Sequence, residues 1–250
     1  RIARAVNHGK TILVRGPIGS GKTRIIHHMA EKTNRHENGI YQVNMSDQLD
    51  GRSMIGGYSC RDVPGQFQWE DGVATKAVEN GKWLIIEDAD QAFRNGIGSD
   101  GGIAGILLTL IERKQLHIPS RGTVLDAAPG FQLFLTQRIE ANDDLKAGSE
   151  DALLTAIART KCNVELFTLH THSQNQLKMI AEKEPLFKLT NPLINNMGSL
   201  NSLLIKMVKC FVALTERSMT APGQIVFAET QKRIFSLRDF LKWCRRCFAT

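Results

Sequence analysis

The stretch that decides the fold is an apolar run, Thr11-Ile12-Leu13-Val14, followed almost at once by Gly16-Pro17-Ile18-Gly19-Ser20-Gly21-Lys22-Thr23. The second part fits the pattern G-x-x-x-x-G-K-[ST], which forms a phosphate-binding loop between a strand and a helix. Its glycines let backbone N–H groups converge on phosphates at the helix N-terminus, where unpaired donors and the helix dipole both favour negative charge. We expect these eight residues to bind a nucleoside triphosphate, with Lys22 on the β- and γ-phosphates and Thr23 as a ligand of Mg²⁺.

Strand-like apolar runs alternate with helical segments over the first two-thirds of the chain. The four runs after the first one are 40–43, 83–86, 131–135 and 164–167. This alternation predicts an α/β fold in three layers, a parallel sheet with helices on both faces. From about His170 the pattern is helical only, with apolar residues at three- and four-residue steps through 199–214 and 236–248. We therefore predict a large α/β nucleotide-binding domain over 1–169 and a small all-α domain over 170–250.

Two segments of the α/β part break this pattern. Residues 50–72 are too rich in Gly for a simple helix, yet a helical stretch follows them, so we expect an insertion that interrupts a helix. Residues 115–126 contain two short apolar runs around a Pro-Ser-Arg-Gly turn, which predicts a projecting β-hairpin.

Composition limits the kind of protein. The chain has 250 residues, no apolar run long enough to cross a bilayer and five scattered cysteines, so we expect a piece of a soluble intracellular protein without a membrane partner. For Cys244-x-x-Cys247 we favour packing on a helix over metal binding, because no second ligand pair accompanies it.

The net charge of +7 is concentrated at the C-terminal end. Residues 206–250 contain nine basic and three acidic side chains, a balance of +6. This excess is compatible with direct contact to nucleic acid or a ribonucleoprotein, and a solvated helix face is the alternative.

Two carboxylates end the apolar run at 83–86. Glu87 and Asp88 follow Lys22 by 65 and 66 positions, and a parallel sheet would bring them to the edge that carries the phosphate loop. One carboxylate can then hold the Mg²⁺ shell and the other can polarise a water molecule, as in a Walker B motif. We expect Glu87 at the metal, and the pair favours attack by water on the γ-phosphate over transfer to a small molecule.

Residues 45–92 resemble the AAA+ modules of the midasin family, the dynein-related ATPases of large ribosomal subunit assembly. The resemblance is carried by Asp50-Gly-Arg-Ser-Met-Ile-Gly-Gly-Tyr58, Pro64-Gly-Gln-Phe-Gln-Trp69 and Gly81-Lys-Trp83, and the first module of that family is most similar. It implies that 50–72 is a helix-2 insertion, that 115–126 is a pre-sensor-1 hairpin, and that 170–250 is a lid. The stretch Phe235-Ser-Leu-Arg-Asp-Phe-Leu-Lys-Trp243 resembles the sensor-2 helix, in which Arg238 would contact the γ-phosphate.

The family resemblance also implies the function. ATP and Mg²⁺ would be the cofactors, neighbouring AAA+ modules and the pre-60S particle would be the partners, and the location would be the nucleus. The whole protein would be a chaperone-like ATPase that remodels precursors of the large ribosomal subunit. An arginine finger would lie before the last strand of the sheet, where Arg159 is the candidate, and an ordinary salt bridge is the alternative for this residue.

Two positions depart from the family pattern. The usual order of the acidic pair is Asp then Glu, whereas this chain has Glu87 then Asp88. Sensor 1 is normally an Asn, and here Arg138 follows Thr136-Gln137. A misplacement of about 1 Å in a catalytic site can reduce the rate about a hundredfold, so we expect firm ATP binding with weak or no hydrolysis.

Three alternatives remain open from the sequence. The first is a structural module whose bound nucleotide never turns over. The second is a MoxR-type or von Willebrand A-associated ATPase that assembles as a homohexamer. The third is a small-molecule P-loop kinase, which would leave the hairpin and Arg238 without a role.

Overall fold

The computed structural model describes residues 1–35, 39–45, 51–60, 66–94, 102–139, 151–160, 164–183, 197–220 and 236–248. By their contacts, residues 1–16 and 21–169 form one compact unit, and residues 17–20 with 170–250 form the second. Each unit has its own hydrophobic core and is described separately below.

A five-stranded parallel sheet forms the centre of the first unit, which confirms the predicted α/β class. Its strand order is β2-β5-β8-β1-β9. The strands are β1 (Thr11–Gly16), β2 (Ile40–Asn44), β5 (Trp83–Glu87), β8 (Gln132–Arg138) and β9 (Val164–Thr168). After β1 the chain runs to the edge strand β2, comes back through β5 to β8 beside β1, and then passes to β9 on the other side of β1. This reversal places a topological switch point between β1 and β8, where open parallel sheets bind ligands at the carboxyl ends of their strands.

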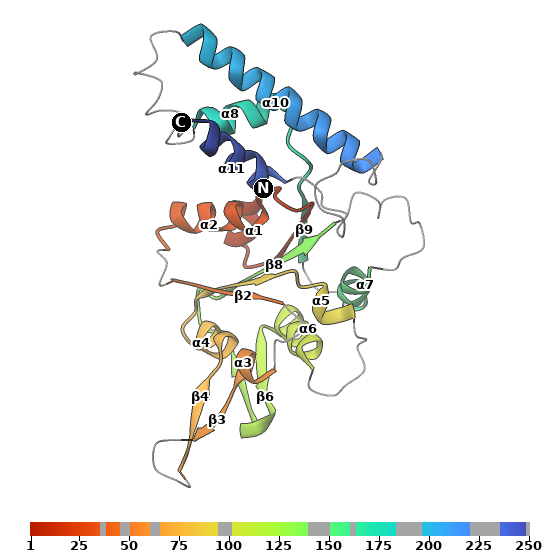
Figure 1. Ribbon diagram of the computed structural model, residues 1–250. Coiled ribbons are helices and arrows are strands. Elements are labelled where there is room, and N and C mark those ends of the chain that lie inside the picture. The colour runs from red at the N-terminus through yellow and green to blue at the C-terminus, as the bar shows by residue number, and fades with distance from the viewer. Residues whose placement is uncertain are drawn as a thin grey trace. The chain divides into compact units, whose positions relative to one another are not determined.

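Helices cover both faces of the sheet (Figure 1). On one face α1 (Ile2–Asn7) and α2 (Lys22–Lys32) pack on alternate strand residues, and this core contains Ile12, Val14, Ile26, Ala30, Ile85 and Phe134. On the other face lie α4 (Val73–Glu79), α6 (Ile103–Arg113) and α7 (Ala152–Arg159), and their core contains Leu13, Leu84, Ile86, Leu107, Leu135 and Leu153. The short helix α5 (Gln91–Arg94) follows β5. Neighbouring strand residues point to opposite faces, so these apolar runs are buried on both sides.

The segment predicted as an insertion contains an antiparallel hairpin between two helices. Helix α3 (Gly51–Ile55) leads into β3 (Gly56–Cys60), which pairs with β4 (Phe67–Asp71), and α4 follows. The hairpin closes where the Gly72 N–H donates to the Ile55 carbonyl oxygen at 2.9 Å. A Cβ atom on Gly72 would lie 2.4 Å from the Met54 carbonyl oxygen, so this close approach requires glycine.

A second hairpin occupies the 115–126 segment. Strands β6 (Gln115–Ile118) and β7 (Thr123–Asp126) pair antiparallel around the 3₁₀ turn η2 (Pro119–Arg121). The side chains of Leu116 and Ile118 are fully buried in the core, whereas Val124 is 55% exposed. Leu125 on β7 is half-buried against the same core, so one face of the hairpin is anchored while residues on the other face are exposed.

The described part of the second unit after Leu169 is helical. It contains α8 (Gln174–Glu182), α10 (Met197–Thr220) and α11 (Leu237–Phe248). Their core includes Leu177, Leu204 and Cys244, and the rings of Phe211 and Phe240 lie 4.9 Å apart within it. Cys244 is thus packed in this core, while the side chain of Cys247 lies outside the described residues.

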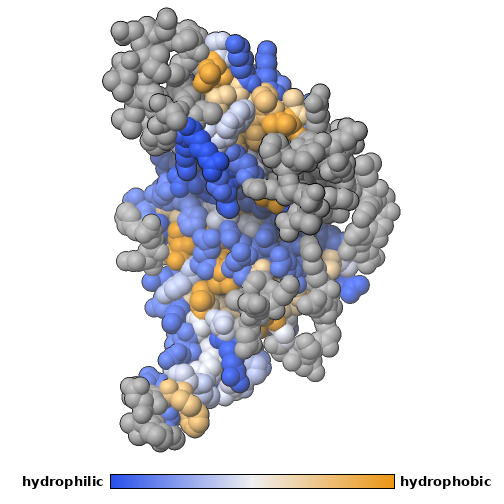
Figure 2. Space-filling model, in the orientation of Figure 1, coloured by the Kyte–Doolittle hydropathy of each residue, from blue (hydrophilic) through white to orange (hydrophobic). Residues whose placement is uncertain are grey.

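The surface in view in Figure 2 is largely hydrophilic, with hydrophobic residues in small groups. In the described ranges, no helix combines the length and the apolar character needed to cross a bilayer.

Candidate functional site

The predicted phosphate-binding loop joins the end of β1 to the start of α2. Gly19 and Gly21 adopt left-handed backbone conformations, with φ of 75° and 88°, which a side chain would disfavour. Gly21 is the N-cap of the eleven-residue helix α2, and no described side chain caps it. The Ser20 hydroxyl is buried and lacks a hydrogen-bond partner among the described residues. These unpaired donors suit a phosphate group, because the N-terminus of a helix leaves N–H groups unsatisfied.

Lys22 is the first residue of α2, directly after this loop. Its Nζ donates a hydrogen bond to the carbonyl oxygen of Gly16 at 3.0 Å. Burial lowers the pKa of Lys22, and the nearby positive charge of Arg138 lowers it further. Three carboxylates act in the opposite direction, those of Asp88, Glu87 and Asp90. Lys22 is therefore a partly desolvated cation among opposite charges.

The hydroxyl of Thr23 donates a hydrogen bond to the Glu87 carboxylate, across 64 positions of sequence. Hydroxyl and carboxylate oxygens are the hard ligands that Mg²⁺ prefers, so this pair fits the predicted metal site. In the described ranges, no group of three or more His, Cys, Asp or Glu side chains could hold a metal. A magnesium ion here would thus depend on few protein ligands together with substrate phosphates and water, which is usual for Mg²⁺.

Asp88 follows Glu87 beyond the end of β5. Its backbone is left-handed, with φ of 50°, a conformation that Asp tolerates better than most residues. Its N–H donates to the Thr136 hydroxyl on β8 at 3.2 Å. The structure thereby ties the second acid to the strand that ends in Arg138.

Arg138 is the last residue of β8 and stands opposite Gly16 of β1 in the sheet register. The next residue, Ile139, donates its N–H to the Gly16 carbonyl oxygen at 3.1 Å. Arg138 is exposed, and its charge lies close enough to Lys22 to lower the pKa of that lysine. The structure therefore brings together Lys22, Thr23, Glu87, Asp88 and Arg138 at the carboxyl edge of the sheet.

The two other predicted arginines, Arg159 and Arg238, have exposed side chains. Arg159 ends α7 with an exposed side chain, and no hydrogen bond or ion pair joins it to any described residue. Exposure is what a residue acting on a neighbouring module requires. Arg238 is exposed on α11 in the second unit, and its contact with nucleotide stays a prediction.

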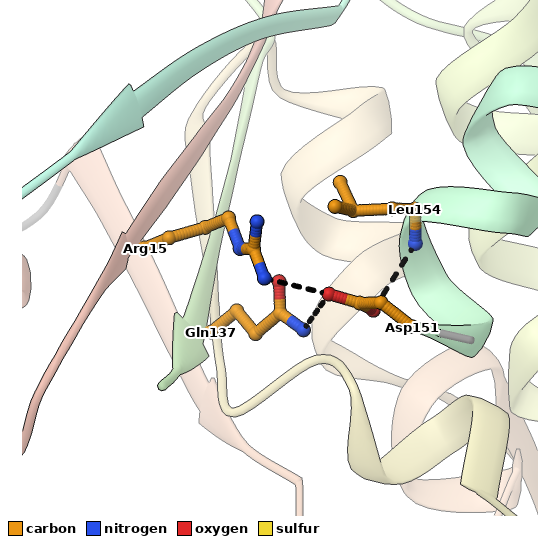
Figure 3. A network of polar contacts seen from close by, with 4 residues as sticks. All are labelled: Arg15, Gln137, Asp151 and Leu154. Atoms are coloured by element: carbon orange, nitrogen blue, oxygen red, sulfur yellow. Dashed lines mark hydrogen bonds and ion pairs between the residues drawn. The ribbon is translucent and has the colours of Figure 1, made fainter. Parts of the chain in front are cut away.

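Sequence reasoning missed a polar network beside the loop, drawn in Figure 3. The Asp151 carboxylate accepts hydrogen bonds from Arg15 on β1 and Gln137 on β8, and it also caps α7. The available signal was Arg15 itself, a charged residue in an otherwise buried strand, where unpaired cations are rare.

Two family models match this chain. One, described as AAA domain (dynein-related subfamily), matches residues 11–159, and the other, described as Midasin AAA lid domain, matches residues 193–250. These matches cover most of the α/β unit, up to the end of α7 but without β9, and most of the helical part.

Relatives of two kinds are similar to the chain. Midasin of Dictyostelium discoideum is 39% identical over 138 residues, which are 55% of this chain and 2% of that protein. Midasin of Giardia intestinalis is 28% identical over 136 residues, 54% of this chain and 3% of that protein. The denitrification regulatory protein NirQ of Stutzerimonas stutzeri is 32% identical over 133 residues, 53% of this chain and 44% of that protein.

The chain thus spans less than half the length of each of these relatives. Because the first family model alone covers more than half of the chain, this protein belongs to the dynein-related subfamily of AAA domains, with a lid of the midasin type.

Proposed function

We propose that this chain is an ATP-binding module of a midasin-like machine that remodels precursors of the large ribosomal subunit in the nucleus. The observation that carries ATP binding is the contact between Thr23 and Glu87 beside the half-buried Lys22. The midasin type of lid supports the choice of machine. Its partners would be neighbouring AAA+ modules of the same ring and, through the whole protein, the pre-60S particle and its assembly factors.

The loop and the acidic pair would bind different parts of the ligand, the phosphates and the Mg²⁺ ion. The backbone of 16–21 and Lys22 would hold the phosphates, and Thr23 with Glu87 would hold Mg²⁺. When bound, Mg²⁺ neutralises charge on the β- and γ-phosphate oxygens. Arg238 would add a contact from the lid.

Within this function, the module binds ATP firmly and hydrolyses it weakly. Glu87 is engaged by the Thr23 hydroxyl, which leaves the shorter Asp88 as the carboxylate for a water molecule. Arg138 stands where an amide would orient that water and places a second cation beside Lys22. Both features support binding of a highly charged anion more than proton abstraction from water.

Placing the family's Glu and Asn at the second acid and at sensor 1 tests this proposal. Single-turnover hydrolysis of radiolabelled ATP is compared between the wild-type chain and a double variant, Asp88→Glu with Arg138→Asn. We expect slow hydrolysis by the wild type and a gain of roughly a hundredfold in the double variant, since geometry of the water controls the rate. Lys22→Met is the matched control that weakens binding itself.

If the wild-type chain hydrolysed ATP rapidly and Asp88→Asn abolished this activity, the claim of weak hydrolysis would be wrong. Tight ATP binding without any gain in the double variant would instead favour a structural module whose nucleotide serves assembly only.

The similarity to NirQ favours a second candidate, a MoxR-type ATPase that acts as a homohexamer. Protein NorQ of Paracoccus denitrificans, 32% identical over 123 residues, is a further relative of similar identity. Oligomeric state separates this candidate from a module of a single-chain ring.

A further inference from the structure

The side chains of Arg15, Gln137 and Asp151, from three different parts of the chain, meet in the network that Figure 3 shows. Arg15 Nη2 donates to Asp151 Oδ2 at 2.8 Å, and Gln137 Nε2 donates to the same oxygen at 2.7 Å. The other oxygen, Oδ1, accepts the Leu154 N–H at 3.3 Å. A single carboxylate therefore joins strands β1 and β8 to the first turn of α7.

Both donors stand one residue away from groups of the candidate site. Arg15 precedes Gly16, whose carbonyl oxygen accepts the hydrogen bond from Lys22. Gln137, which is only 5% exposed, precedes Arg138. If phosphate binding shifted the end of either strand, the shift would displace a hydrogen-bond donor of Asp151.

Helix α7 is suited to carry such a shift. Its inner face is held by the buried side chains of Leu153 and Ala156, and its last residue is the exposed Arg159. A rigid helix of eight residues is about 12 Å long, so a small change at its N-cap moves the group at its far end.

The charges of the network favour a specific role over simple helix capping. The side chains of Arg15 and Asp151 are 21% and 22% exposed, so the pair is much less screened than a surface salt bridge. A cap needs one acceptor oxygen, which Leu154 already uses. The second oxygen serves only the two strands.

We propose that Asp151 is a positioning residue that couples nucleotide occupancy of the phosphate loop to the docking of α7, and through it to the direction of Arg159. This inference depends on the proposed ATP binding. It assigns the coupling to the Oδ2 oxygen, which bonds the strands, rather than to the Oδ1 oxygen, which caps the helix.

Hydrogen exchange on the full chain tests the coupling. Exchange of the α7 amides is followed with and without a non-hydrolysable ATP analogue and Mg²⁺, whose binding is measured separately by calorimetry. In the wild type we expect the analogue to slow exchange in α7 by about fivefold or more, the lower range of allosteric coupling.

Two substitutions at the same position separate the two roles of Asp151. Asp151→Asn keeps a good N-cap, so the α7 amides should keep their protection from exchange without nucleotide. The increment, meaning the additional protection of α7 caused by the analogue, should disappear. Asp151→Ala should lose both. Arg15→Gln should abolish the increment as Asp151→Asn does, and the double variant should add nothing further, since both changes break one interaction.

The matched control is Glu165→Gln, which also removes one acidic charge and breaks the 3.0 Å ion pair of Glu165 with Lys10. This variant should keep the full increment. An Asp151→Asn variant that behaves like the wild type would overturn the inference and leave Asp151 as a cap. Binding of the analogue without a change in α7 would also overturn it, while absence of binding to the wild type would overturn the proposed function as well.

Discussion

At the scale of single residues, the surroundings of Lys22 suit the phosphate group that we propose as its ligand. Folding places this cation in a partly buried position beside Arg138, which lowers its pKa. Its hydrogen bond to the Gly16 carbonyl oxygen compensates for part of the lost hydration. We therefore expect the Lys22 charge to stabilise a bound phosphate more than it stabilises the ligand-free folded chain.

We expect Lys22→Met to weaken ATP binding by roughly 10- to 150-fold, since hydrogen bonds to charged groups contribute about 1.5–3 kcal/mol. Without ligand, the Lys22→Met chain should be at least as stable as the wild-type chain near neutral pH, because the substitution removes a desolvated charge. Calorimetric titration and thermal unfolding measure the two effects. Lys10→Met is the control, and equal loss of binding in both variants would contradict a specific role for Lys22.

The lowered pKa of Lys22 also predicts a dependence of stability on pH. Between the folded-state pKa and the ordinary value of 10.5, the unfolded chain binds more protons at this site than the folded chain does. The contribution of Lys22 to the free energy of unfolding should therefore rise with pH across that window. Denaturant unfolding of the wild type and Lys22→Met over this range should show a more positive slope for the wild type. A slope that is the same in both proteins would argue against the desolvation of Lys22.

At the scale of elements, the hairpin β6–β7 is attached to the core by one of its faces. Leu116 and Ile118 flank the exposed His117 on β6, so both enter the core from that face. On β7 Leu125, which pairs with Leu116, is half-buried against the same core, whereas Val124 faces solvent. The attachment therefore depends most on the two fully buried side chains of β6.

Ile118→Ala should therefore destabilise the chain by about 2–5 kcal/mol, the usual cost of a large cavity in a core. Val124→Ala, the matched change on the facing strand, should alter stability by no more than about 0.5 kcal/mol. Denaturant unfolding monitored by circular dichroism measures both. Similar effects of the two substitutions would mean that the hairpin does not dock as described.

At the scale of the whole molecule, the chain forms two units with separate cores. The two families that match them, a dynein-related AAA domain and a midasin lid, are consistent with one AAA+ module. In the midasin relatives this module corresponds to 2–3% of the protein, whereas in NirQ it corresponds to 44%.

We therefore expect the chain to remain monomeric with Mg²⁺ and ATP, as a module whose neighbours lie in the same polypeptide. Light scattering coupled to size-exclusion chromatography measures its mass with and without nucleotide, and Lys22→Met controls for effects of ATP alone. A hexamer that forms only with ATP would support the MoxR-type candidate instead.

The sequence by itself determined the five strands, the phosphate loop, the hairpin at 115–126 and the change to helices near His170. Each of these depends on local periodicity or on glycines at fixed spacing, which neighbouring residues encode directly. It also indicated Glu87 and Asp88, because carboxylates at the end of a buried strand stand out.

Only the tertiary structure decided the strand order, the antiparallel pairing within 51–72, the bond between Thr23 and Glu87, and the network around Asp151. These features join residues as far as 153 positions apart, as Thr11 and Val164 are. The pKa of Lys22 is lowered by burial and by the charge of Arg138, which folding brings near it from β8. Their physical cause is non-local, since burial and charge at one edge of a sheet exist only after distant strands have come together.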